Sequence, residues 1–197
     1  AAEDAGTYVM VHVYVPEAIR RAIRAGVKSI EHGQLIDEPT MKLIAEKGVW
    51  LSMQPFIGEG NNHYTNPVQQ AKHELVVQGT DRAYQLAKKY GVKLAWGTDL
   101  LFSPANARNQ NLNIEKMTRW FSNFEILKMI THDNAELLAL SGRRNPYPGK
   151  LGVIEEGALA DLIVVDGNAL EDIKVLTDPG KNMLLIMKDG KIYKNDL

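Results

Sequence analysis

Short apolar segments alternate with segments of helical pattern through the first half of the chain, and this alternation constrains the fold more than any other feature. Each apolar segment has the length of a buried strand, and the strand–helix repeats measure about 20 to 45 residues. Repeats of this kind predict right-handed βαβ units and a parallel sheet. The expected strands are Tyr8–Tyr14, Val27–Glu31, Val49–Met53 and Lys93–Trp96.

The segments between these strands carry residues that start and stop helices. Proline suits the first turn of a helix, and glycine adopts the left-handed conformation that often ends one. We therefore expect helices over Pro16–Arg24, from an N-cap at Asp37 to Gly48, and over Pro67–Tyr90. Gly79 is a point at which the last of these helices could break.

The chain changes character near Ser141–Lys150, where glycine and proline accumulate. Before this stretch we expect two helices, Glu115–Ile130 and His132–Leu140. After it the pattern is extended, and the Asp-Gly pair at 189–190 predicts a tight hairpin. We therefore divide the chain into an α/β domain, 1–145, and a small β module, 146–197. The strands expected in the module are Gly152–Glu155, Asp161–Val165, Met183–Lys188 and Lys191–Tyr193.

The composition is that of a globular protein, and it argues against several classes of binding partner. The chain has 197 residues, 45% of them hydrophobic, and a formal net charge of −1. This charge gives no electrostatic reason to expect binding to nucleic acid or to an anionic membrane. No apolar run approaches the ~20 residues of a membrane span. There is no cysteine, which excludes disulfides and a Cys nucleophile and is compatible with the cytoplasmic location that we adopt as the expectation.

Three side chains that can bind a metal ion stand where predicted strands end. His12 lies near the end of the first strand, His32 follows the second, and Asp99 follows the fourth. The carboxyl ends of parallel strands meet at one edge, and in α/β barrels this edge carries the active site. Imidazole and carboxylate are the usual ligands of a catalytic divalent ion, which makes hydroxide available from bound water at neutral pH. The three residues therefore predict metal-assisted hydrolysis.

Each of these residues also has a structural interpretation. A single histidine at a strand end is more often hydrogen-bonded within the fold than bound to a metal, and an aspartate after Gly-Thr can cap a turn. Three such residues at equivalent positions favour the metal site. Tyr14 projects to the same side of its strand as His12, so its phenol could bind substrate or pack in the core. His63, in the long loop after the third strand, is a weaker candidate for substrate contact.

These segments, in this order, resemble the amidohydrolase superfamily, and within it the imidazolonepropionase-like branch that includes Xaa-Pro dipeptidases. The resemblance covers essentially the whole chain and is specific for the superfamily rather than for a substrate. The distinctive pieces are His12–Tyr14, the run from Ala18 to Gly33 (AIRRAIRAGVKSIEHG), Gly97-Thr98-Asp99, and the run from Gly152 to Gly167 (GVIEEGALADLIVVDG).

The resemblance implies a (β/α)8 TIM-type barrel flanked by a β-sandwich, of which this chain would supply the last four βα units and part of the sandwich. By the same resemblance, His12 and His32 are metal-binding histidines, and Asp99 is both a metal ligand and the general base. Tyr14 would assist at the scissile carbonyl. The expected cofactor is a divalent metal ion, with zinc as the first choice, and the expected substrate is a small amide or dipeptide.

The chain departs from the family pattern, because it has no counterpart of the His-x-His pair of the first barrel strand or of the fourth-strand lysine ligand. We therefore expect it to be the C-terminal half of such an enzyme. One interpretation is a metal-dependent hydrolase of carbon–nitrogen bonds, including those of cyclic amides. A second is an inactive fragment or half-barrel scaffold that holds one metal site or none, and a third is deamination of a ring amine. A half barrel exposes sheet edges, so we expect a homo-oligomer.

Overall fold

The computed structural model describes residues 1–58, 64, 66–100 and 107–197. They form two compact units, Ala1–Gly97 and Thr98–Leu197. The domain boundary expected between residues 145 and 146 lies inside the second unit, where it separates helices from strands, and it stays a prediction.

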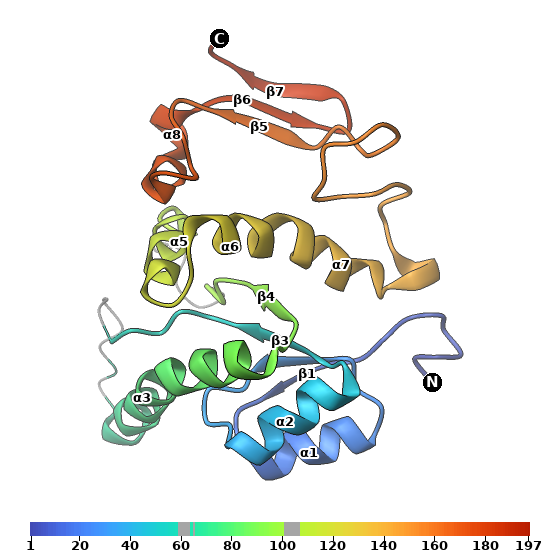
Figure 1. Ribbon diagram of the computed structural model, residues 1–197, viewed down its shortest axis with the longest axis vertical. Coiled ribbons are helices and arrows are strands. Elements are labelled where there is room, and N and C mark those ends of the chain that lie inside the picture. Colours follow the sequence, from blue (N-terminus) through green and yellow to red (C-terminus); the bar gives the residue numbers. More distant parts are fainter. Residues whose placement is uncertain (59–63, 65, 101–106) are drawn as a thin grey trace. The chain divides into compact units, whose positions relative to one another are not determined.

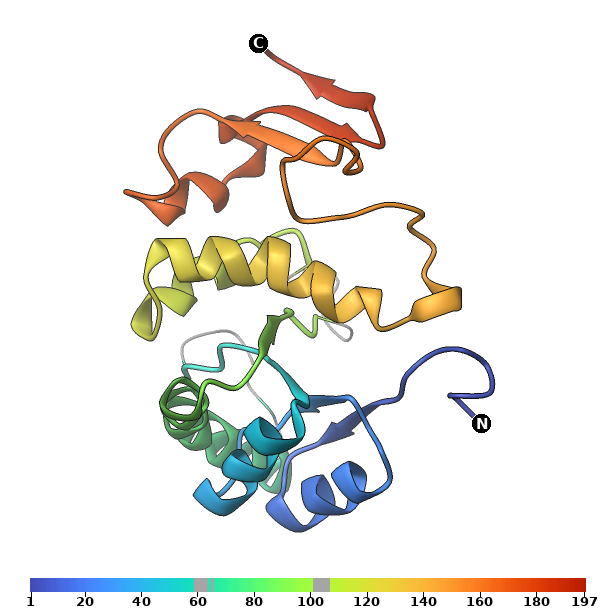
Figure 2. The ribbon, with the colours of Figure 1, turned by 45° about the vertical axis from the view of Figure 1, so that its right-hand side comes forward.

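The first unit is an α/β structure built on a parallel sheet, as the strand–helix alternation predicts. Its strands are β1 (Met10–Val13), β2 (Ser29–His32), β3 (Trp50–Met53) and β4 (Leu94–Trp96), and they pair in the order β1-β2-β3-β4. Figures 1 and 2 show the connecting helices on one face of this sheet. These helices are α1 (Pro16–Arg24), α2 (Glu38–Lys47) and α3 (Pro67–Tyr90).

The core of this unit lies between the sheet and its helices. Ile30 of β2 and Leu51 of β3 are register partners, and both are fully buried. Ile19 of α1 and Ile44 of α2 are also fully buried. Burying an aliphatic side chain of this size contributes about 1.5–3 kcal/mol, so this interior is a large part of what holds the helices to the sheet.

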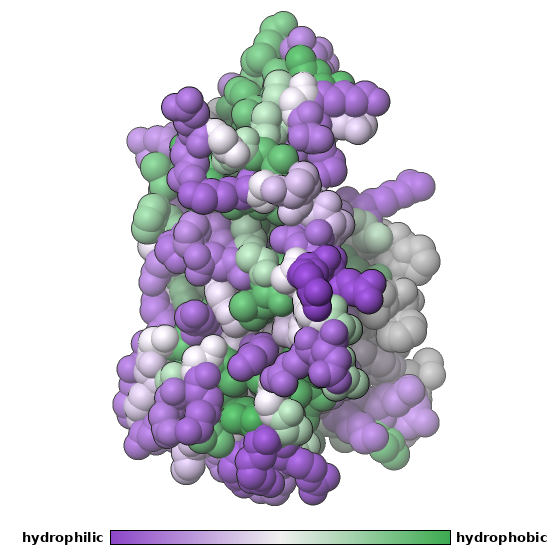
Figure 3. Space-filling view, turned by 90° about the vertical axis from the view of Figure 1, so that its right-hand side faces the viewer, coloured by the Kyte–Doolittle hydropathy of each residue, from purple (hydrophilic) through white to green (hydrophobic). Residues whose placement is uncertain are grey.

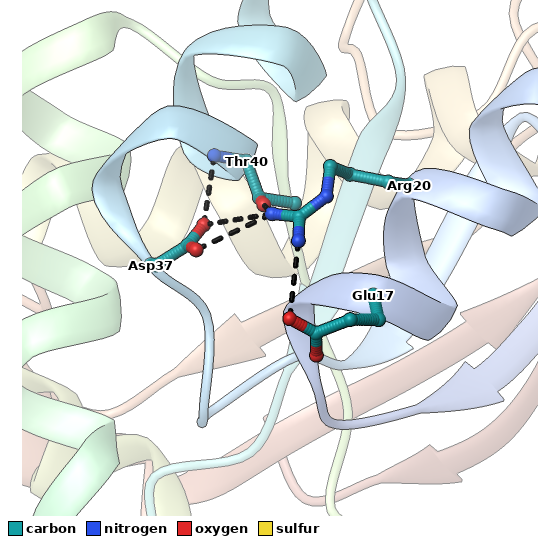
Figure 4. Close-up of polar contacts among 4 residues, drawn as sticks. All are labelled: Glu17, Arg20, Asp37 and Thr40. Carbon is teal, nitrogen blue, oxygen red and sulfur yellow. Dashed lines mark hydrogen bonds and ion pairs between the residues drawn. The ribbon is translucent and has the colours of Figure 1, made fainter.

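A polar cluster joins α1 to the start of α2 (Figure 4). Asp37 is the N-cap of α2, as predicted, and its carboxylate accepts a hydrogen bond from the Thr40 backbone N–H at 2.9 Å. Arg20 of α1 forms an ion pair with Asp37 at 3.3 Å and another with Glu17 at 3.1 Å. Desolvation raises the pKa of the Asp37 carboxyl, but hydrogen bonds from Thr40 and Arg20 outweigh it and leave this pKa below its usual value.

The third helix runs without interruption through the glycine where a break was anticipated. A Cβ at Gly79 would lie 2.2 Å from the backbone oxygen of Gln34, so α3 packs directly against the chain that follows β2. A glycine allows this close approach, and burial of the helix offsets the intrinsic cost of glycine within it.

The second unit begins with short helices whose boundaries differ from the predicted ones. They are α5 (Leu112–Lys116), α6 (Asn123–Lys128) and α7 (Asn134–Ala139), and a π-helical turn, Met129–Asp133, joins the last two. The prediction of one helix over Glu115–Ile130 is wrong, because Ser122 and Glu125 form a capping box that starts α6 afresh.

The chain then forms an antiparallel sheet of three strands, β5 (Leu162–Val165), β6 (Met183–Lys188) and β7 (Lys191–Asn195), with the short helix α8 (Pro179–Asn182) before β6. The hairpin predicted at Asp189-Gly190 is confirmed, and both residues have the positive φ that its tight turn requires, 48° and 73°. The strand predicted at Gly152–Glu155 is not formed. Gly152 has φ 71° and lies against the carbonyl of Thr131, so the segment packs on the π-helical turn instead of pairing in a sheet.

Apolar side chains reach the surface at both sheets. Val9 and Met10 at β1 are 45% and 50% exposed, and Ile163, Ile192 and Tyr193 of β5 and β7 are exposed as well. In Figure 3 this apolar surface is visible at the top, where the β5–β7 part of the chain lies. Over the ranges that the structure describes, no helix is long and apolar enough to cross a membrane.

Candidate functional site

Two histidines and a tyrosine meet at the carboxyl ends of β1 and β2. His12 belongs to β1, Tyr14 follows its last residue, and His32 ends β2. The ring centroids of His12 and His32 are 4.3 Å apart in an edge-to-face arrangement, and those of His12 and Tyr14 are 5.1 Å apart. The rings of Tyr14 and His32 are stacked, with centroids 4.8 Å apart and planes 13° from parallel. The structure therefore brings together three of the residues that the sequence singles out.

An unusual backbone conformation places the His32 ring in this cluster. In a regular strand, His32 would project to the side of its register partner Val13, which is the side opposite His12. Instead His32 has φ 81° and Gly33 follows with φ 73°, so the chain turns sharply at the end of β2. A residue other than glycine adopts such a conformation at a cost of about 1–3 kcal/mol, and residues of this kind cluster at functional sites.

A buried pair of glutamines lies on the other side of the His32 ring. His32 is 4% exposed, and its Nδ1 lies 2.7 Å from Oε1 of Gln54, which is equally buried. Gln34 donates from Nε2 to the same oxygen at 3.4 Å. Neither glutamine was among the predicted site residues, although Gln54 directly follows β3 and so occupies the type of strand-end position that singled out His32.

The sheet face that carries His12 also carries a carboxylate. Glu31 of β2 is the register partner of His12, and register partners on neighbouring strands project to the same face. The Ser29 hydroxyl donates to the Glu31 carboxylate at 2.6 Å. Burial raises the pKa of the nearby Tyr8 phenol, and the negative charge of Glu31 raises it further. The Glu31 carboxylate thus places a negative charge on the face of the sheet that carries His12, and this charge would attract a cation to that face.

The remaining predicted residues lie outside this cluster. Asp99 is exposed, has φ 53°, and belongs to the second unit, two residues after Gly97. His63 lies outside the described residues. Among the residues that the structure describes, no three His, Cys, Asp or Glu side chains are grouped so that they could hold a metal ion. The sequence-based roles of Asp99 and His63 stay predictions.

The donor chemistry of the two histidines fits part of a metal centre. A histidine that binds a metal through one ring nitrogen commonly donates its other ring N–H to a carbonyl or carboxylate oxygen. The contact between His32 Nδ1 and the Gln54 amide oxygen has this character. His12, exposed at the end of the neighbouring strand, supplies a second imidazole beside it. The chain therefore offers two nitrogen donors side by side at the edge where ligands bind in parallel α/β proteins.

Comparison with known proteins identifies the family. Residues 1–193 match the amidohydrolase family, and the chain belongs to it. It is 33% identical over 190 residues to an ochratoxinase of Aspergillus niger, which corresponds to 94% of this chain and 38% of that protein.

Solved structures agree with this assignment. An amidohydrolase crystal structure superposes with a TM-score of 0.86 at 36% identity, covering 100% of this chain and 46% of the other. A prolidase in complex with N-methylphosphonate-L-proline superposes with a TM-score of 0.85 at 35% identity, covering 98% of this chain and 47% of the other. The chain thus spans less than half the length of these relatives, and it is an enzyme chain by family.

Proposed function

We propose that this chain carries part of the active site of a metal-dependent hydrolase that cleaves the carbon–nitrogen bond of small amides or dipeptides. The observation that carries the proposal is the cluster of His12, Tyr14 and His32 at the carboxyl edge of a parallel sheet in a member of the amidohydrolase family. The similarity to a prolidase in complex with N-methylphosphonate-L-proline supports a dipeptide-like substrate.

The proposed architecture is the last four βα units of a (β/α)8 barrel, followed by part of a β-sandwich. Two observations support it. The strands β1 to β4 follow one another in sequence order across the sheet, with their helices on one face, as successive units of a barrel do. The chain also covers slightly less than half of the structures with which it superposes along nearly its whole length.

His12 and His32 are the residues that would hold a divalent ion, which we propose to be zinc, with Asp99 as a further ligand. Such an ion acidifies a bound water and polarises a carbonyl. The carboxylate of Asp99 would accept a proton from the attacking water and deliver it to the leaving nitrogen, as a general base and then a general acid. The Tyr14 phenol would donate a hydrogen bond to a carbonyl or carboxylate oxygen of the substrate.

Metal analysis and a substrate panel test the proposal. The protein that carries this sequence would be purified, analysed for zinc and manganese, and assayed on dipeptides that differ in the C-terminal residue, proline included. We expect at least one divalent ion per chain, and hydrolysis that a chelator removes and added metal restores. Less than one ion per chain together with no hydrolysis would contradict the proposal and support an inactive half-barrel scaffold.

A further inference from the structure

The side of the His32 imidazole that faces the protein interior is held by an oxygen that can only accept hydrogen bonds. Gln54 Oε1 is an amide oxygen 2.7 Å from His32 Nδ1, and both residues are only 4% exposed. An amide oxygen has lone pairs and no proton, so Nδ1 must supply the hydrogen. In a neutral imidazole with its proton on Nδ1, the lone pair that can bind a metal is on Nε2.

A second glutamine supports the orientation in which the oxygen of the Gln54 amide, and not its NH2 group, faces His32. Gln34 donates from Nε2 to Gln54 Oε1 at 3.4 Å, so two donors converge on one oxygen. If the Gln54 amide were turned over, its NH2 group would face the NH2 group of Gln34, and two donors facing each other are unfavourable in a buried place. Gln34 is 1% exposed, and its own Oε1 finds no hydrogen-bond partner among the described residues. Of the two glutamines, Gln54 is the one that contacts His32 Nδ1, and Gln34 is the one whose amide oxygen is unpaired.

We propose that Gln54 is a positioning residue for the metal site, which holds His32 in the Nδ1–H form so that Nε2 is the metal-binding nitrogen. This inference rests on the proposed function, since it assigns His32 as a ligand. Gln54 itself stays behind the ring and does not touch metal or substrate. It acts by fixing the tautomer and the ring orientation, as oxygen acceptors behind metal-bound histidines commonly do.

Nitrogen NMR of the histidine side chains tests the tautomer without relying on activity. In metal-free protein labelled with ¹⁵N-histidine, the ring nitrogens of His32 would be identified by comparison with a His32→Asn variant. We expect the proton of the neutral His32 tautomer to lie on Nδ1, which is the less common tautomer of a free histidine side chain. A His32 ring protonated on Nε2 and not on Nδ1 in the unaltered protein overturns the proposal. This measurement does not depend on whether any Gln54 variant folds.

Three glutamine variants separate the role of the oxygen from that of packing. Gln54→Met keeps the volume and removes the acceptor, so we expect the Nε2–H form of His32 to appear and zinc affinity to fall 10- to 100-fold in a competition assay. Gln54→Glu restores an acceptor and should keep both the Nδ1–H form and the affinity. Gln34→Met is the matched control, because it removes a buried amide of the same size and leaves the Gln54 oxygen in place.

The outcomes distinguish this proposal from the function on which it rests. If Gln54→Met leaves the His32 tautomer unchanged, or if Gln34→Met changes it equally, Gln54 has no specific positioning role. If His32 is Nδ1–H and switches in Gln54→Met as expected, the positioning role is supported. Failure of the unaltered protein to bind zinc or manganese would then count against the proposed function alone.

Discussion

At the scale of single residues, two consecutive left-handed conformations shape the candidate site. His32 and Gly33 have φ values of 81° and 73°, and this turn brings the His32 ring to His12 and Tyr14. A Cβ at position 33 would lie 2.8 Å from Cδ1 of Leu51, a fully buried side chain. The glycine is therefore required both by its backbone conformation and by the close approach of the core.

Replacement of this glycine should destabilise the protein more than replacement of a glycine in open space. Gly33→Ala would suffer the left-handed strain of about 1 kcal/mol and, in addition, about 1–3 kcal/mol from overpacking against Leu51. Gly48→Ala is the matched control, since Gly48 has φ 63° and no atom within 4 Å of an added Cβ. Urea denaturation measures both free energies of unfolding. Equal losses in the two variants would show that the contact with Leu51 is easily relieved.

The role proposed for Asp99 makes a prediction about turnover. Asp99→Asn should lower the rate of hydrolysis by at least about 10²–10⁴-fold, because a general base and a metal ligand are lost together. Asp189→Asn is the matched control, because Asp189 is also exposed and has a similar positive φ, 48° against 53° for Asp99. Steady-state kinetics with an active substrate provide the measurement. A normal rate in Asp99→Asn would remove this residue from the mechanism.

At the scale of helices and strands, α2 and α3 are joined by a contact between the start of one and the end of the other. The carboxylate of Glu38, the first residue of α2, lies 2.7 Å from the Lys89 ammonium and accepts a hydrogen bond from the Tyr90 hydroxyl. The hydrogen bond from Lys89, with that from Tyr90, lowers the pKa of Glu38 to about 2. Glu38 is also at a helix N-terminus, where negative charge is favourable.

This contact predicts a pH dependence of stability. The pKa of Glu38 is lower in the folded state, about 2 against an ordinary 4.5, so between these values the unfolded chain binds more protons. The contribution of Glu38 is therefore present above pH 4.5 and lost as the pH falls toward 2. Denaturation curves at several pH values should show a shallower acid loss in Glu38→Gln than in the unaltered protein. Glu46→Gln is the matched control, because it removes an equal charge from the same helix. Parallel curves of stability against pH for Glu38→Gln and the unaltered protein would contradict the expectation.

The helices and strands also show which local sequence signals were sufficient to predict the structure. The Asp37 N-cap, the left-handed Gly48 that ends α2, the bounds of α3 and the Asp-Gly hairpin all formed as predicted, because each depends on residues close in sequence. The segment at Gly152 did not form a strand, because its position depends on the Thr131 carbonyl of a distant turn. Gly79 was ambiguous for the same reason, since only the packed structure shows the Gln34 backbone against it.

At the scale of the whole molecule, the parallel sheet has two edge strands. Within the described residues, each of them pairs with another strand on one side only. β1 is at one end of the sheet order and β4 at the other, and Met10 on β1 is half exposed. An exposed edge strand with apolar side chains is a template for pairing with another chain. The edge at β1 is therefore a candidate surface for association.

We therefore expect the 197-residue chain to self-associate at micromolar concentration, as measured by size-exclusion chromatography with light scattering. Met10→Lys should weaken the association, because lysine on an edge strand opposes pairing. Ile154→Lys, at a residue that is 97% exposed and lies outside the strands, adds the same charge and should leave it unchanged. A monomer at this concentration, or equal effects of the two variants, would contradict an association through β1.

The sequence by itself determined the order of the βα units, the N-cap and terminal glycine of α2, the bounds of α3, and the positions of His12, His32 and Asp99 relative to the strands. These properties are local, since strand and helix periodicity, capping and tight turns depend on neighbouring residues. The tertiary structure alone decided that the His32 ring faces His12 and Tyr14, and that Gln54, 22 residues further along the chain, holds its Nδ1. Such contacts depend on how strands are packed side by side, and no local pattern encodes which distant side chain will meet another.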